Sequence, residues 1–377
     1  MKRSIKLLGI IGFLIMAHAC YAFTNKTYFE PEPNTRIGLT FNNDKEDINL
    51  IIKTGDTQIG GTLTTPVKPE VSSLVILLSG SGDQDRDETL EGFKILKVIA
   101  DHLASKGIAS FRYDDRGVGE STGDFVNSTI EDHSNDLKNI MDYFKSNIKH
   151  PFHDFILFGH SQGGILASKV AVGNTSVKKV ILMGAPAVPL VEVVLYQVRQ
   201  ENNEANISKP LIEANVSAHS RLMWAIKDNK NINEALSLFR ESTEVILYES
   251  SLSKNVVDTL KIEKEALAKT KEFKIIYGLP SLTSFLYYDP SIDLKQLEVP
   301  VLGLFGGLDF QVTIDQNKDR MENALLKSGS DYQFITFEHA NHFFQKATTG
   351  RRDEYPFLEK KFVNRFLDKI TNWIIGN

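Results

Sequence analysis

The sequence predicts an α/β fold in which a mostly parallel, doubly wound sheet carries a helical cap insertion. Two observations lead to this expectation. Short apolar runs alternate with segments of helical spacing between residues 73 and 183, and the same alternation returns after residue 300. Between these two parts, residues 188–298 carry Leu, Val and Ile at helical spacing but show no strand pattern.

The first part of the predicted core begins with a hairpin and continues as alternating strands and helices. The hairpin pairs Ile48–Lys53 with Gln58–Thr65 around a Gly-Asp turn. The run Ser73–Leu78 is continuously apolar, as expected of a strand that is buried on both faces. The elements that follow are a helix at Phe93–Lys106, a strand at Ile108–Arg112, a helix at Thr129–Ile148, a strand at Asp154–Phe158, a helix at 164–172 and a strand at Lys179–Met183.

The regular alternation stops at Pro186 and gives way to the insertion, with helices predicted at 190–205, 209–228, 231–249 and 253–270. The second part of the core has a strand at Val301–Phe305, a helix at Ile314–Lys327, a strand at Tyr332–Phe337 and a terminal helix at Tyr355–Ile375. The core therefore comprises residues 48–187 and 299–377, and residues 188–298 form a cap over the carboxyl ends of the strands. The alternative is a separate helical domain with its own function.

The N-terminus is typical of a signal peptide over residues 1–22. Three basic residues precede the apolar run Leu7–Met16, and small residues suitable for cleavage follow up to Ala22. Ten apolar residues are too few to span a membrane. We therefore expect an exported protein, periplasmic or secreted, with no stable membrane insertion after cleavage and a polar lead-in at 23–47. The less favoured alternatives are an uncleaved anchor and a lipoprotein through Cys20.

The composition excludes several classes of function. The 377 residues are 42% hydrophobic and 24% charged, with a net charge of −5 and no basic stripe, so nucleic acid is not expected as a partner. Cys20 is the only cysteine, so a chain cleaved after Ala22 has no disulfide, no thiol nucleophile and no thiolate metal site. No metal or cofactor is predicted, and the sequence does not indicate the oligomeric state.

The segment Gly159–Gly163, Gly-His-Ser-Gln-Gly, lies between a predicted strand and a predicted helix. In such a turn the backbone bends so sharply that side chains two residues on either side of the serine would collide, and glycine removes the clash. The serine hydroxyl then stands above the sheet beside the positive end of the next helix. This arrangement predicts a nucleophile at Ser161; the alternative is an ordinary small-residue turn.

A serine nucleophile needs a base and an acid that orients the base. Asp309 and His342 follow the last two predicted strands, at the edge where functional side chains of parallel sheets gather. His339 competes with His342 as the base, and either residue of the predicted pair could instead be an ordinary loop residue. The amide N–H groups of Gln162 and Ser81 are the expected donors of an oxyanion hole.

Four segments together resemble the α/β-hydrolase superfamily, in the group of serine-aminopeptidase-like or dienelactone-hydrolase-like esterases. They are Ser79–Asp87 (S-G-S-G-D-Q-D-R-D), Arg112–Ser121 (R-Y-D-D-R-G-V-G-E-S), Gly159–Gly164 (G-H-S-Q-G-G) and Phe285–Pro290 (F-L-Y-Y-D-P). The resemblance extends from about residue 48 to the end of the chain. It departs at Asp83, where proline is common, and the cap residues 188–270 match no motif, so the resemblance does not indicate the substrate.

The expected function is carboxylic-ester hydrolysis of a small-molecule substrate through an acyl-enzyme on Ser161. Phe285, Leu286 and Tyr287 are expected to line the acyl pocket, unless they only pack the cap onto the core. The alternatives are a non-catalytic binding protein and an amide hydrolase of the aminopeptidase type. An exopeptidase would need carboxylates in the cap to hold the substrate amine, and the candidates are Glu192, Glu201, Glu204 and Glu213.

Overall fold

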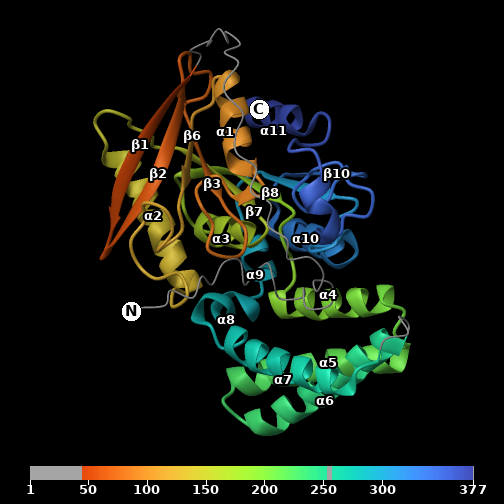
Figure 1. Ribbon diagram of the computed structural model, residues 1–377. Helices are drawn as coiled ribbons and strands as arrows, with labels where there is room; N and C mark the ends of the chain where they lie inside the picture. The colour runs from red at the N-terminus through yellow and green to blue at the C-terminus, as the bar shows by residue number, and fades with distance from the viewer. Residues whose placement is uncertain (1–44, 253–256, 377) are drawn as a thin grey trace, which may run out of the picture.

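The computed structural model describes residues 45–252 and 257–376, so the predicted signal peptide and nearly all of the lead-in lie outside the described residues. Its main sheet has eight strands in the order β1-β2-β6-β3-β7-β8-β9-β10 (Figure 1). The strands of this sheet are β1 (Lys45–Thr54), β2 (Thr57–Pro66), β3 (Leu74–Leu78), β6 (Ser110–Tyr113), β7 (Phe155–His160), β8 (Val177–Met183), β9 (Val301–Gly306) and β10 (Tyr332–Phe337).

Strands β6, β3, β7, β8, β9 and β10 run parallel to one another, whereas β1 and β2 form an antiparallel hairpin and β2 pairs antiparallel with β6. Parallel neighbours need long crossover connections, and helices provide them here. The helices of the core are α1 (Ile95–Ser105), α2 (Ile130–Ser146), α3 (Gln162–Ala171), α10 (Ile314–Ser328) and α11 (Phe366–Ile375). The predicted parallel, doubly wound sheet is confirmed.

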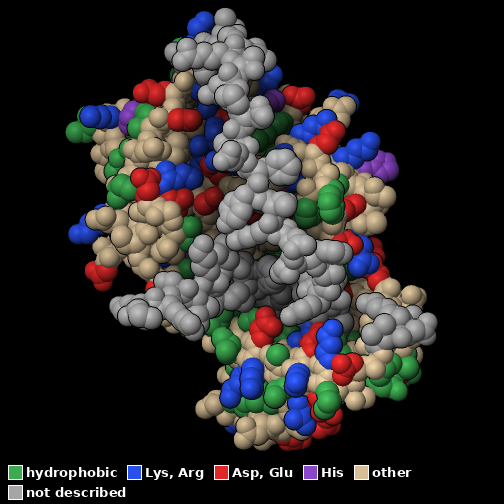
Figure 2. All heavy atoms as spheres, viewed as in Figure 1, with side chains coloured by type: hydrophobic (Ala, Val, Ile, Leu, Met, Phe, Trp, Pro, Cys, Tyr) green, Lys and Arg blue, Asp and Glu red, His purple; other side chains and the backbone are tan. Residues whose placement is uncertain are grey.

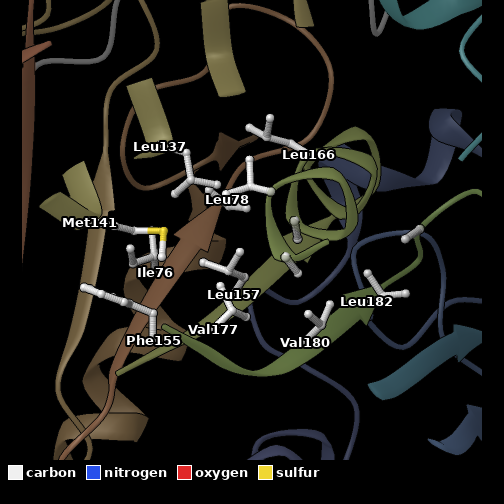
Figure 3. Close-up of a cluster of buried hydrophobic side chains, with 14 of the residues drawn as sticks. Ile76, Leu78, Leu137, Met141, Phe155, Leu157, Leu166, Val177, Val180 and Leu182 are labelled. Atoms are coloured by element: carbon white, nitrogen blue, oxygen red, sulfur yellow. The ribbon is translucent and has the colours of Figure 1, made fainter. Parts of the chain in front are cut away.

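The central strands are buried on both faces, and alternate side chains enter two different cores. On β3, Ile76 and Leu78 lie in the cluster that includes α2, α3 and α10, whereas Val75 and Leu77 lie in the cluster of α1 and α11. Figure 3 shows part of the first cluster, in which Leu157 of β7 lies between Ile76 and Val180. This burial explains why the central strands read as continuous apolar runs in the sequence.

The chain between β8 and β9 forms the helical insertion, which lies at one end of the sheet (Figure 1). Its helices are α4 (Leu190–Glu204), α5 (Lys209–Lys227), α6 (Ile232–Leu252), α7 (Thr259–Ile276), α8 (Pro280–Leu286) and α9 (Ser291–Leu294). It has an apolar cluster of its own, centred on Leu222, Phe239 and Tyr277. Acidic and basic side chains are interspersed on the face seen in Figure 2. No described helix is both long and apolar enough to cross a membrane.

The structure differs from the expected elements mainly near the C-terminus. The single helix expected at Tyr355–Ile375 is instead a short 3₁₀ segment, η1 (Arg352–Phe357), followed by an irregular stretch and then α11. Pro356 lies in this segment, and a proline has no N–H for a helical hydrogen bond and restricts the residue before it. A small hairpin of β4 (Thr89–Leu90) and β5 (Phe93–Lys94) also precedes α1, where the sequence predicted helix from residue 93.

The buried charges around β6 hold the loops next to the site in place. Asp114 accepts hydrogen bonds from the backbone N–H and from Nε and Nη2 of Arg86, and also from the N–H of Glu120. Arg116 makes two hydrogen bonds to the buried carboxylate of Asp136 on α2. These bidentate contacts join the loops after β3 and β6 to the body of the core.

Leu157 provides a test of the core below the site. Its side chain is fully buried in β7, so Leu157→Ala is expected to lower the free energy of unfolding by about 2–5 kcal/mol. Leu326 on α10 is 62% exposed, and the matched change Leu326→Ala is expected to alter it by less than about 0.5 kcal/mol. Urea unfolding of the two variants measures the difference, and equal losses would contradict the assigned position of β7 in the core.

Candidate active site

Ser161 joins β7 to α3 in a strained conformation. Its φ is +50° and its ψ is −121°, a region that residues with side chains rarely adopt. A Cβ placed on Gly159 would lie 2.3 Å from the carbonyl oxygen of Gly163, and one placed on Gly163 would lie 2.5 Å from the carbonyl oxygen of Ser79. Both contacts are with backbone, which cannot rotate away. The turn therefore requires glycine at both positions, as the sequence predicted.

The turn Gly159–Gly163, called the elbow below, is held on its other side by β8. The N–H of Ser161 donates to the carbonyl oxygen of Met183 at 2.8 Å, and the N–H of Gly164 donates back to the Ser161 carbonyl oxygen at 2.9 Å. These bonds fix the direction in which the serine side chain leaves the backbone. Ser161 thus lies at the carboxyl edge of the sheet and directly before the first turn of α3.

Asp309 and His342 come together as the sequence predicted, although 33 positions separate them. Nδ1 of His342 lies 2.8 Å from Oδ2 of Asp309, and both side chains are buried. The other carboxylate oxygen of Asp309 accepts the N–H groups of Gln311 and Val312, each at 2.8 Å. Asp309 is therefore held as an acceptor by three donors.

This geometry assigns the proton on His342. Because the Asp309 carboxylate accepts at Nδ1, that nitrogen carries the hydrogen, and in the neutral ring Nε2 keeps its lone pair. Burial lowers the pKa of His342, while the charge of Asp309 and its hydrogen bond raise it, and the net direction is downward. The ring is thus favoured in the neutral form that can accept a proton.

In the described part of the chain, no hydrogen bond joins the hydroxyl of Ser161 to His342. Catalytic hydrogen bonds are often loose in unliganded enzymes and tighten when the substrate binds. The competing histidine, His339, lies in the same loop but is exposed. It has no carboxylate partner among the described residues.

The two predicted oxyanion donors have free amides. Across residues 45–252 and 257–376, the N–H groups of Gln162 and Ser81 donate to no acceptor, and Gln162 is the first residue of α3. The neighbouring amide of Gly80 is not available, because it donates to Oε1 of Glu88 at 2.8 Å. Of the two residues that the Gly80-Ser81 turn offers, Ser81 therefore has the amide that is free to bind an oxyanion.

Sequence reasoning missed a second buried carboxylate–histidine pair beside the first. Nδ1 of His160 lies 2.7 Å from Oε1 of Glu88, and Nε2 of His160 lies 3.1 Å from the carbonyl oxygen of His342. The rings of His160 and His342 are 4.7 Å apart. His160 lies within the elbow motif, but nothing in the spacing of the sequence pairs it with a glutamate 72 positions earlier.

A small cavity lies beside the elbow, bounded by the loop after β3, the start of α3, and Phe285 of the insertion. The space open to the centre of a water molecule is about 20 Å³. Asp115 and His133 supply polar groups to its wall, and burial lowers the pKa of His133 to about 4. Gln162 also lines the cavity, and its Oε1 atom is buried with no hydrogen-bond partner among the described residues.

Of the three residues expected to line an acyl pocket, only Phe285 lines this cavity. Leu286 is fully buried in the apolar cluster of the insertion. The hydroxyl of Tyr287 donates to the carbonyl oxygen of Met223, and its ring packs 5.0 Å from that of Trp224. Leu286 and Tyr287 thus contact residues of the insertion itself.

The insertion directly contacts the loop that carries Asp309. Nε2 of Gln197, on α4, donates to the carbonyl oxygen of Gln311 at 2.7 Å, and the N–H of Gln311 is one of the donors to Asp309. One residue therefore links α4 to the carboxylate that orients His342. Within the described residues, no group of three or more His, Cys, Asp or Glu side chains is arranged to hold a metal ion.

A family model described as serine aminopeptidase, S33, matches residues 90–345, which is more than half of the sequence. The chain belongs to this family. The matched region contains the elbow, Asp309, His342 and the whole insertion, and the resemblance seen in the four sequence motifs is confirmed.

The chain is also similar to individual proteins. Esterase EstD of Thermotoga maritima is 25% identical over 325 residues, which cover 84% of this chain and 65% of the relative. The proline iminopeptidase of Mycobacterium smegmatis superposes with a TM-score of 0.51 at 15% identity, over 87% of this chain and 97% of that one. Esterase Pf2001 of Pyrococcus furiosus gives 0.49 at 12% identity, over 83% and 90%. The fold is the α/β-hydrolase fold with a helical insertion.

Proposed function

We propose that this protein is a carboxylic-ester hydrolase that acts through an acyl-enzyme on Ser161. His342 takes the proton of the serine hydroxyl and returns it to the leaving alcohol, and Asp309 orients His342 and stabilises its charged form. The amides of Gln162 and Ser81 bind the oxyanion. Water then releases the acid, with His342 again acting as the base.

The observation that carries the proposal is a strained serine at the N-terminus of α3, on the sheet edge that also carries a buried Asp309–His342 pair. Backbone strain at φ +50° persists only where the surrounding structure imposes it, and such strain is concentrated at functional sites. The similarity to esterase EstD supports an ester as the substrate.

The carboxylates of the insertion are poorly placed to bind the amino terminus of a peptide, and this favours an ester as the substrate. Glu204 and Glu213 each form an ion pair with an arginine, and Glu192 is exposed to solvent. Burial raises the pKa of Glu201 to about 8, so this carboxyl is largely neutral at pH 7 and binds an ammonium group poorly. A panel of p-nitrophenyl esters and aminoacyl p-nitroanilides compares the two substrate classes.

Covalent chemistry at Ser161 is the first expectation. A fluorophosphonate probe should label the wild-type protein and leave Ser161→Ala unlabelled, and kcat on an ester should fall by about 10⁴–10⁶-fold in the variant, as for other triad nucleophiles. Gel fluorescence and p-nitrophenol release measure the two effects. Equal labelling of both proteins would refute Ser161 as the nucleophile, and a wild type with no labelling would favour a binding protein.

The choice between the two loop histidines is tested by His342→Ala and His339→Ala. The first should lose nearly as much activity as Ser161→Ala because base and nucleophile act as a unit. The second removes an exposed side chain and should leave kcat/KM within about a factor of two, as for most surface changes. Inactivity of the His339 variant alone would show that the base had been assigned to the wrong residue.

We infer that the acyl group enters the small cavity beside the elbow, whose lining includes Gln162 and Phe285 but not Ser161 itself. A space of about 20 Å³ holds one water molecule or a group of similar size, and Phe285 closes it from the insertion. We therefore expect acetyl and propionyl esters to be preferred. Phe285→Ala should shift the preference toward longer chains, by about 10–200-fold in relative kcat/KM per methylene.

The control for this change is Tyr287→Ala, because the contacts of Tyr287 with Met223 and Trp224 lie within the insertion. Its chain-length profile should stay that of the wild type, with probe labelling of Ser161 intact in both variants. A Phe285 variant with an unchanged profile would restrict that residue to packing. A shifted profile in the Tyr287 variant would extend the pocket to this side of the insertion.

A further inference from the structure

Glu88 and His160 are buried charged groups that the proposed reaction does not use. Their side chains are 3% and 1% exposed, and they lie 2.7 Å apart. Glu88 holds a φ of +48°, so its backbone is strained like that of Ser161. Its Oε1 atom also accepts the N–H of Gly80, the residue before the proposed oxyanion donor Ser81.

The hydrogen-bond partners of His160 fix its protonation state. Nδ1 faces the carboxylate of Glu88, and Nε2 faces the backbone carbonyl oxygen of His342. With Glu88 ionised, both partners are acceptors, and a neutral imidazole has only one N–H to donate. Both contacts are then satisfied together only by the imidazolium form of His160. Burial opposes the charge on His160, but Glu88 and the two hydrogen bonds outweigh it, so the pKa of His160 is raised.

We propose that Glu88 and protonated His160 form a buried ion pair that positions the catalytic base. The pair connects three segments that are distant in sequence, namely the oxyanion loop at Gly80, the last residue of β7 before the nucleophile, and the loop of His342. Glu88 and His160 are therefore positioning residues, and their effect on catalysis rests on the ester-hydrolase function proposed above.

The ion pair also acts on the charge state of His342. The charged groups that face His342 are Asp309 after β9, His160 at the end of β7 and Glu88 after β3. Asp309 and Glu88 favour the imidazolium form of His342, whereas the positive ring of His160, 4.7 Å away, disfavours it. Protonated His160 thus helps to keep His342 neutral, and so able to accept a proton, at lower pH.

The first experiment needs no substrate and is independent of the proposed function. Protein labelled with ¹⁵N-histidine is observed by NMR at pH 8, with His160→Gln used to assign the signal. Both ring nitrogens of His160 should carry hydrogen in the wild type. In Glu88→Gln the carboxylate charge is gone while an oxygen acceptor remains, and the ring should become neutral. A neutral His160 in the wild-type protein would overturn the proposal.

The second experiment measures kcat/KM against pH with p-nitrophenyl acetate. His160→Gln should lower the plateau by about 10²-fold, because a base misplaced by about 1 Å loses that much. The midpoint of the acid limb should also rise by about one pH unit, because a positive neighbour of His342 is lost. His339→Gln, in the same loop but exposed, should leave both values unchanged.

The possible outcomes distinguish a role of the ion pair in positioning His342 from a role only in the stability of the fold. A folded His160→Gln protein with the wild-type acid limb would overturn the role of the pair, even if the plateau falls. If His160→Gln does not fold, the double variant Glu88→Gln/His160→Gln removes both charges together and avoids an unpaired buried carboxylate. Because Glu88 and His160 act on the pKa of His342 in opposite directions, the midpoint of the double variant should move less than that of a single variant, whereas its plateau should still fall, and a wild-type plateau there would overturn the proposal. A wild-type protein inactive on every ester, with a doubly protonated His160, would overturn the proposed function alone.

Discussion

The arrangement of the whole site depends on a steric constraint at the end of β7. The backbone of Gly163 passes so close to Gly159 and to Ser79 that no side chain fits at either glycine. This close approach brings the start of α3 against the loop after β3. As a result, Ser161 and both proposed oxyanion amides occupy one small region, and the proposed acid and base, Asp309 and His342, reach that region from the remaining strands.

The electrostatic organisation around this point consists of two carboxylate–histidine pairs that differ in their acceptors. His342 has one carboxylate acceptor at Nδ1, and its other nitrogen keeps a lone pair in the neutral ring. His160 has an acceptor at each nitrogen. The same two residue types therefore give a proton acceptor in one case and a fixed positive charge in the other, and the backbone carbonyl of His342 makes the difference.

Much of this structure was predictable from the sequence, because its strongest constraints are local. The G-x-S-x-G turn requires glycine wherever it occurs, and buried parallel strands require apolar runs, so both could be recognised. The end of the chain was predicted less well, because apolar spacing over 355–375 suggested one helix, whereas Pro356 separates a 3₁₀ segment from α11. The positions of Asp309 and His342 followed from strand order. The pairing of Glu88 with His160 did not, since it depends on how two loops fold over each other.

The contacts of the insertion could not be derived from the sequence either, since helical spacing shows which residues are buried but not what they touch. Phe285, Leu286 and Tyr287 are consecutive, yet the first lines the cavity beside the elbow and the other two pack among the helices. On a short helix, neighbouring residues point in different directions, and only the position of that helix on the core decides which of them faces the site.

The insertion leaves the core after β8 and returns at β9, and these strands are direct neighbours in the sheet, with Val180 beside Val301. Because these strands are parallel, the insertion leaves at the carboxyl end of β8 and rejoins the core at the amino end of β9, so it contains the crossover that this pair of strands requires. Such a crossover can change in length without changing the register of either strand. The helices α4, α8 and α9 contact the core, so variation confined to α5, α6 and α7 would leave both the sheet and these contacts in place.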